Sequence, residues 1–147
     1  MAFEEYLEFL RQLQRELEEL NAVEQKKIEA VRDGDLEGLG ECMKQEQAAT
    51  LALRGREQRR TAMLAELGLQ QVPLRDLAKH APDDCREEAA RTVEHLLRTY
   101  QVLSSARNTA RTLMESQLHI IEKQLNQQNE KQEETHAAGQ SQTDFRV

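Results

Sequence analysis

Residues 3–20 read FEEYLEFLRQLQRELEEL, and this stretch decides the fold. Its large apolar residues recur at alternating spacings of three and four residues, which places them on one face of a helix. Glu24 and Lys27 interrupt this stripe further along the chain. The sequence therefore predicts one long amphipathic helix over residues 3–32. The members of its apolar stripe are Phe3, Tyr6, Leu10, Leu13, Leu17, Leu20 and Val31.

An Asp-Gly-Asp turn at residues 33–35 ends this helix and starts the next. Gly34 can adopt the positive φ of a helix C-cap, and Asp35 is a good N-cap. A turn this short makes the second helix, expected over residues 35–68, an antiparallel neighbour of the first. Gly55 in its interior indicates local thinning or a close approach. The stripe expected to face the core is Leu36, Leu39, Met43, Thr50, Leu53, Leu64 and Leu67.

Both prolines lie in the segment that follows the second helix. Pro73 is expected to begin one short helix, and Pro82 comes just before a cap at Asp83 or Asp84. A third long helix is then predicted over residues 84–130. Its core-facing stripe is expected to be Ala89, Val93, Leu96, Tyr100, Leu103, Arg107, Ala110, Met114 and Ile121.

The composition agrees with an all-helical chain. Only 3% of the 147 residues are aromatic, and 6 Gly and 2 Pro are too few for the turns of an all-β fold. The predicted fold is all-α: an elongated antiparallel helical bundle or coiled coil of three long helices plus a short connecting helix. Residues 1–130 are expected to form the bundle domain. Residues 131–147 are too polar to stay folded alone and are expected to be a flexible tail.

Charge and cysteine usage exclude several classes of protein. A net charge of −7 argues against nucleic acid as a partner and offers no patch for an anionic membrane. No apolar run approaches the roughly 20 residues that span a bilayer, and the acidic N-terminus is unlike a signal peptide. Cys42 and Cys85 form no CxxC pair, so a reducing cytosol is the simplest setting. We therefore expect a cytoplasmic protein.

No catalytic or metal-binding motif is present in the sequence. It contains no P-loop, GxGxxG, GxSxG or HExxH pattern, so no catalytic residue, enzyme activity or cofactor is predicted. His80, His95 and Cys85 lie near Asp83 and Asp84, but they lack the paired spacing of a structural zinc site, so no metal is expected. The arginines of residues 54–60 surround a glutamate and indicate a salt-bridged helix face.

The informative segment is the end of the third helix. Between Leu113 and Leu125 the apolar residues fall on several faces, more than one buried stripe requires. We interpret them as a surface for a partner helix; a wide core face or a self-dimer seam are the alternatives. Phe145 or Val147 would fold back onto this surface as a weak placeholder. The predicted partner-binding residues, with two polar residues as rim, are Asn108, Leu113, Met114, Gln117, Leu118, Ile121 and Leu125.

Four short motifs between Leu20 and Leu69, and an asparagine on the last helix, carry a resemblance to a known family. The motifs are Ala22-Val23-Glu24-Gln25, Arg32-Asp33-Gly34-Asp35-Leu36, Met43-Lys44-Gln45-Glu46 and Arg56-Glu57-Gln58-Arg59-Arg60, with Asn108 as the asparagine. Together they resemble the FlgN family of cytoplasmic flagellar export chaperones. The chain departs from the family pattern at Gln47, where a lysine is expected, and at Ser104, where another asparagine is common.

The resemblance implies a function without catalysis. A member of this family would hold the amphipathic terminal helices of hook–filament junction proteins and deliver them to the flagellar export apparatus. The alternative, which the heptad over residues 3–20 also supports, is a structural coiled-coil protein that homodimerises through its last helix and has no secretion client.

Overall fold

The computed structural model describes the backbone of residues 2–144 and the side chains of residues 2–134. Over this part of the chain every regular element is a helix, and there is no strand. The all-α prediction is therefore confirmed. The elements are α1 (Ala2–Asp33), α2 (Leu36–Glu66), the short 3₁₀ helix η1 (Leu74–His80) and α3 (Arg86–Asp144).

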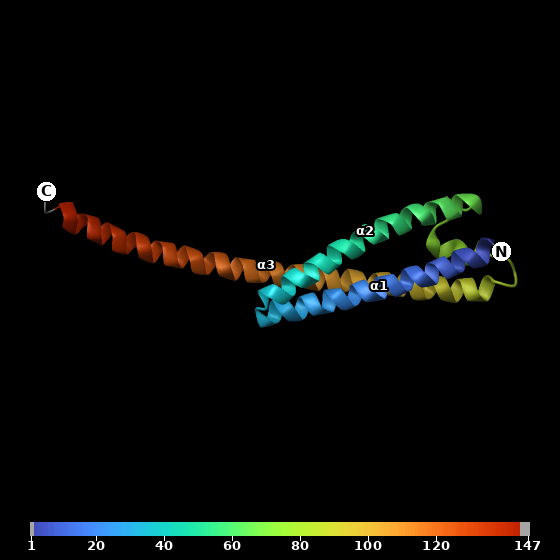
Figure 1. The fold of residues 1–147 in the computed structure, drawn as a ribbon, viewed down its shortest axis with the longest axis horizontal. Helices are drawn as coiled ribbons and strands as arrows, with labels where there is room; N and C mark the ends of the chain where they lie inside the picture. The colour runs from blue at the N-terminus through green and yellow to red at the C-terminus, as the bar shows by residue number, and fades with distance from the viewer. Residues whose placement is uncertain (1, 145–147) are drawn as a thin grey trace. The chain divides into compact units, whose positions relative to one another are not determined.

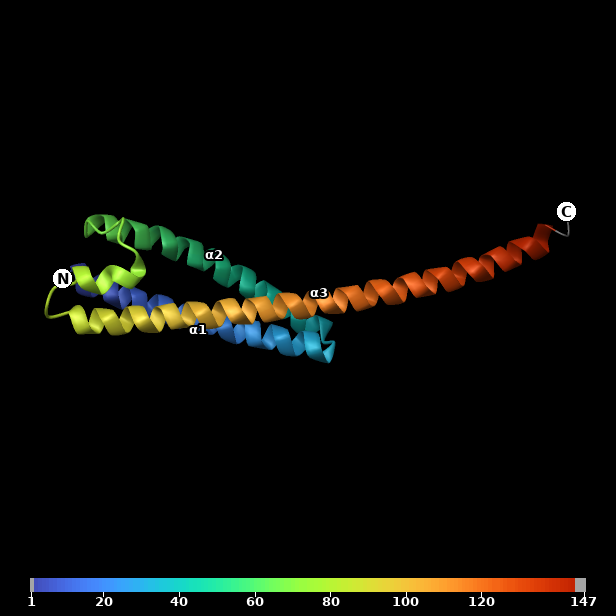
Figure 2. The ribbon, with the colours of Figure 1, turned by 180° about the vertical axis from the view of Figure 1, so that it is seen from behind.

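The chain divides into two compact units, Met1–Ala110 and Arg111–Val147. The N-terminal unit contains α1, α2, η1 and the first part of α3. Within it, α1 and the first part of α3 run side by side in one direction, and α2 runs in the opposite direction (Figure 1). The view from behind shows the same order (Figure 2). The described part of the C-terminal unit is the rest of α3.

The apolar stripe of α1 forms the centre of the core. Leu10 is fully buried, and Leu13 and Leu17 are each only 2% exposed, as the heptad predicts. Leu77 of η1 and Leu96 of α3 pack into the same cluster. The core is therefore built mainly of leucine and is shared among the helices of the N-terminal unit. The other α1 residues in this cluster are Phe3, Tyr6, Leu7, Phe9 and Leu20.

The turn between α1 and α2 has the predicted caps. Gly34 has φ +68°, and the Asp35 N–H donates to the Ala30 carbonyl at 2.9 Å, while the Gly34 N–H donates to Val31. These bonds form a Schellman motif, which needs a left-handed residue at Gly34. The Asp35 carboxylate accepts a hydrogen bond from the Gly38 N–H at 2.9 Å and caps α2.

The second connection ends α2 in the same way. Gly68 has φ +71°, and the Leu69 N–H reaches the Leu64 carbonyl at 2.9 Å. Pro73 precedes η1, as predicted. α3 begins later than expected, at Arg86: the Cys85 carbonyl accepts the first helical bond, and Asp83 pairs with Arg86 at 2.8 Å rather than capping the helix.

Two residues of the predicted core stripe of α2 are wrong. Leu36 is 79% exposed and Met43 is 40% exposed, whereas Cys42 and Leu64 are buried. Between residues 42 and 49 the inward face lies one position before the predicted one, and it includes charged residues that a search for apolar periodicity passes over. The residues at heptad spacing on this face are Cys42, Glu46, Ala49, Leu53, Arg56, Arg60, Met63 and Leu67.

Each charged residue on the inward face of α2 has a partner on α1. The Lys27 Nζ lies 2.8 Å from the Glu46 carboxylate, and Arg56 lies 2.8 Å from Glu16. The Arg60 guanidinium lies beside the phenol of Tyr6, where it opposes the rise that burial causes in the pKa of that phenol. The pairs occur at successive levels of the antiparallel interface. They compensate the desolvation of side chains that would otherwise be costly to bury.

Two further expectations differ from the structure. No described atom lies within 4 Å of a Cβ built at Gly55, so the expected close approach is absent there. α3 continues beyond residue 130 to Asp144. The flexibility of the predicted tail stays a prediction, and Phe145 and Val147 lie outside the described residues.

Truncating the α1 stripe will destabilise the protein. Leu13→Ala and Leu17→Ala are each expected to lower the free energy of unfolding by about 2–5 kcal/mol, because both side chains are almost completely buried. Leu51→Ala, at a residue that is 69% exposed, is the matched control and should change it by less than about 1 kcal/mol. Denaturant unfolding followed by circular dichroism measures all three. Equal effects at Leu17 and Leu51 would contradict the assigned core.

Replacing Gly34 or Gly55 by alanine is expected to change the stability of the protein in opposite directions. A Cβ meets no described atom within 4 Å at Gly34 or at Gly55, so the backbone alone decides. Gly34→Ala should cost about 1–2 kcal/mol of stability because φ is positive there. Gly55→Ala should add up to about 1 kcal/mol because it lies in a helix interior. Thermal unfolding of the two variants tests this; a gain at Gly34 would show that the turn is not a left-handed cap.

Candidate functional site

The predicted partner-binding residues lie along α3. Leu118, Ile121 and Leu125, all in the C-terminal unit, are 56%, 49% and 52% exposed. Leu113 and Met114 are partly buried. These are large apolar side chains on a surface, which soluble domains rarely cluster without a reason. The rim residue Gln117 is exposed in the same unit, and Asn108 is an exposed residue of the N-terminal unit.

Helical spacing separates these residues into two faces. At 3.6 residues per turn, Met114, Leu118, Ile121 and Leu125 lie on one face of α3. We call these four residues the apolar strip. Gln117 lies beside it. Leu113 and Ile120 lie on a flanking face, beyond Gln117 and roughly 110° or more around the helix from the strip, and Ile120 is 46% exposed. The structure thus brings four of the predicted residues together and sets Leu113 apart.

The apolar strip is suited to association and carries no group for bond-making chemistry. It contains only aliphatic and thioether side chains, so it offers no nucleophile or general base for catalysis. Covering a Leu or Ile side chain is worth about 1.5–3 kcal/mol. Residues spaced by three, four and seven positions are the anchors by which one amphipathic helix recognises another.

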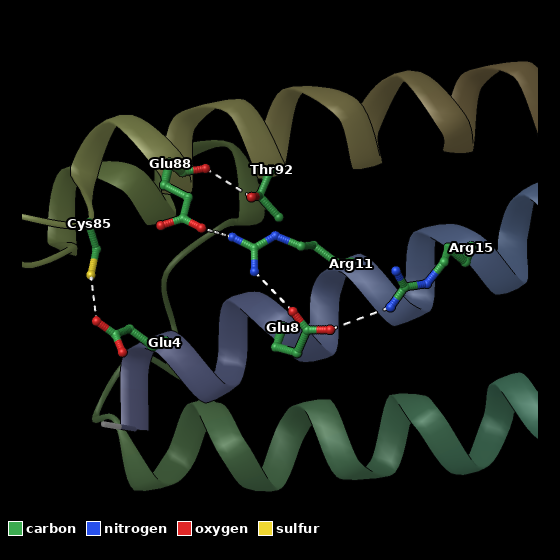
Figure 3. A network of polar contacts seen from close by, with 7 residues as sticks. All are labelled: Glu4, Glu8, Arg11, Arg15, Cys85, Glu88 and Thr92. Carbon is green, nitrogen blue, oxygen red and sulfur yellow. Dashed lines mark hydrogen bonds and ion pairs between the residues drawn. The ribbon is translucent and has the colours of Figure 1, made fainter.

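A polar network lies elsewhere, between α1 and the start of α3 (Figure 3). Arg11 bridges the carboxylates of Glu8 and Glu88, and Arg15 reaches Glu8 at 3.4 Å. A shallow depression of about 570 Å³ opens beside these residues. Because both arginines already have carboxylate partners, this surface is an ion-pair network and holds no free cation pair for a phosphate.

The acidic segment before α3 brings Cys85 close to two carboxylates. Glu4, Asp84 and Cys85 place their ligand atoms within 4.8 Å of one another, without His80 or His95. The thiol lies 3.8 Å from the Glu4 carboxylate (Figure 3). Burial and the neighbouring Asp84 and Glu4 charges raise the pKa of Cys85. A protonated thiol is neither a strong nucleophile nor a ready metal ligand.

The structure contains one polar site that is not among the site residues predicted from the sequence. Glu24 is fully buried among α1, α2 and α3, near Lys27, Glu46 and Arg107. The signal was present in the sequence: Glu24 and Lys27 interrupt an otherwise apolar stripe. Periodicity alone does not say whether such an interruption faces water or the core, and here it faces the core.

No helix in the described part of the chain combines the length and apolarity needed to cross a membrane.

Comparison with known proteins identifies the family. Searches against curated proteins and against solved structures gave no match. The family model described as FlgN protein matches residues 1–140, which is nearly the whole chain. FlgN is a chaperone family and not an enzyme family. The chain is therefore a member of the FlgN family.

Proposed function

We propose that this protein is a cytoplasmic export chaperone of the flagellar secretion system. Its apolar strip would hold an amphipathic terminal helix of a hook–filament junction protein and keep it from associating before export. The observation that carries the proposal is the half-exposed Leu118, Ile121 and Leu125 on a single face of α3. Membership of the FlgN family supports the role in flagellum assembly.

The physics of such a complex is helix-in-groove recognition coupled to folding. A client segment that is disordered on its own loses conformational entropy when it becomes a helix. Burying its apolar face against the apolar strip compensates that loss. The apolar strip contains only four side chains, so the apolar area that it can bury is limited. A complex of this size can be stable in the cytoplasm and still dissociate when the client is delivered to the export apparatus.

The sequence around the strip suits a surface that must stay in solution without its client. Residues 126–134 are exposed and contain no apolar side chain. Gln117 offers a neutral hydrogen-bonding group beside Ile121, so it can pair with the client backbone or polar side chains without a charge to desolvate. The rest of the strip's neighbourhood includes both signs of charge, Glu122 and Lys123 among them.

Charging the apolar strip is expected to abolish client binding. In Leu118→Asp/Ile121→Asp, the client can no longer cover the exposed half of each apolar side chain, a loss of about 1.5–3 kcal/mol for the two together, which corresponds to a Kd raised by roughly ten- to a hundredfold before the cost of desolvating the new carboxylates. Helix content should remain nearly unchanged, because both side chains are already half-exposed. Calorimetric titration with a peptide from a junction protein's terminal helix measures the affinity. Far-UV circular dichroism checks the fold.

The matched control places the same charges on exposed apolar residues of α2. Leu36→Asp/Leu51→Asp should bind the peptide like the wild type, because these residues are exposed but lie outside the strip. Wild-type affinity in Leu118→Asp/Ile121→Asp would place the client site elsewhere. Unfolding of that variant would show that the residues are core. A loss of self-association without any effect of the peptide would favour the homodimeric coiled coil.

A further inference from the structure

Glu24 is a carboxylic acid in an unusual place. Its side chain has no exposed surface, although it occupies the stripe of α1 that is otherwise apolar. Among the described residues, neither of its two carboxyl oxygens accepts a hydrogen bond. The nearest cationic nitrogens are Lys27 Nζ at 3.9 Å and Arg107 Nε at 3.8 Å, beyond hydrogen-bonding distance. An ionised carboxylate in this position would be strongly destabilising.

A second carboxyl group explains how Glu24 is accommodated. The charged groups that face it are Lys27 from α1, Glu46 from α2 and Arg107 from α3. Lys27 donates to the Glu46 carboxylate at 2.8 Å, so the closest cation is already engaged with the other acid. A protonated Glu24 would be a hydrogen-bond donor. Lys27 Nζ lies within 4 Å of a carboxyl oxygen of each acid, which brings the two carboxyl groups close together, so the O–H of a protonated Glu24 can donate to Glu46.

We propose that Glu24 and Glu46 share one proton at the centre of the three-helix layer, and that this proton makes the N-terminal unit a pH-responsive bundle. With the proton present, Glu24 donates to an ionised Glu46, which also accepts from Lys27. When the proton leaves, two carboxylates face each other in the core. Arg107, whose side chain is 43% exposed, then has room to close on Glu24 as the replacement partner.

The directions of the two pKa shifts agree with this assignment. Burial, followed by the hydrogen bond to Glu46, raises the pKa of Glu24 to about 7. The hydrogen bond from Glu24 lowers the pKa of Glu46 from its ordinary 4.5. One acid therefore keeps its proton up to near-neutral pH, and the other gives its proton up more readily than a free glutamate. This is the pattern expected when two interacting acids hold a single proton.

The sign of the pH dependence follows from linkage. Between the ordinary pKa of 4.5 and about 7, the folded chain holds a proton on Glu24 that the unfolded chain has released. The unfolding free energy contributed by Glu24 is therefore fully present below this window and falls as pH rises through it. Glu46 has the opposite sign, and its contribution is lost only as pH falls below 4.5. Measurements from about pH 5 to about pH 8 thus isolate Glu24.

The test compares Glu24→Gln with Glu29→Gln, which changes an exposed glutamate of the same helix. A glutamine amide can donate to Glu46 at any pH and so mimics the protonated acid. The urea midpoints of the wild type and Glu29→Gln should fall between about pH 5 and about pH 8. Glu24→Gln should lose most of that fall. The midpoints of Glu24→Gln and the wild type should be closest at the acidic end.

A titration of the Glu24 side-chain carboxyl carbon by NMR tests the proposal in the unmodified protein. The expected midpoint is far above that of a free glutamate, and Arg107→Gln should raise it further because a nearby cation favours the ionised form. A Glu24 midpoint near 4.5 would overturn the proposal. So would a pH dependence of the urea midpoint that is the same in Glu24→Gln and Glu29→Gln.

Discussion

The structure depends on the apolar stripe of α1. With few aromatic residues in the chain, burial of leucine side chains supplies most of the driving force, and α1 carries the longest uninterrupted set of them. The inward face of α2 carries charges, and η1 is short, so neither can form a core alone. Each of them reaches stability by packing on α1. The loss of one α1 leucine therefore weakens the packing of every element of the N-terminal unit.

Polar pairs make the alignment of the helices specific. A leucine core tolerates several registers, because one leucine fits as well as the next. The contacts Lys27–Glu46 and Arg56–Glu16 are satisfied only when α1 and α2 align as they do. Shifting the helices by a turn would leave half-buried charges without partners, which costs more than it gains. A polar contact also links α1 to α3, since Arg107 approaches Glu24 from that helix.

How far the sequence predicts the structure depends on how apolar each helix face is. The α1 stripe, the Gly34 cap and the Gly68 helix end follow from spacing and turn chemistry, and the structure has them. The inward face of α2 could not be found in this way, because Glu46 and Arg60 resemble surface residues until their partners are known. The spacing around Leu118 predicts apolar residues on more than one face, but their exposure depends on which other helices cover them, and spacing does not give that.

Exchange of backbone amide hydrogens tests most directly whether the apolar strip is an open surface that a client covers. In the free chain, amides of the α1 core should be strongly protected and those of residues 114–125 only weakly, because few side chains cover them. Adding a junction-protein helix peptide should protect residues 114–125 and leave α1 as it was. The account would be contradicted if residues 114–125 were already protected in the free chain, with protection that grew with protein concentration. It would also be contradicted if the peptide protected a different segment.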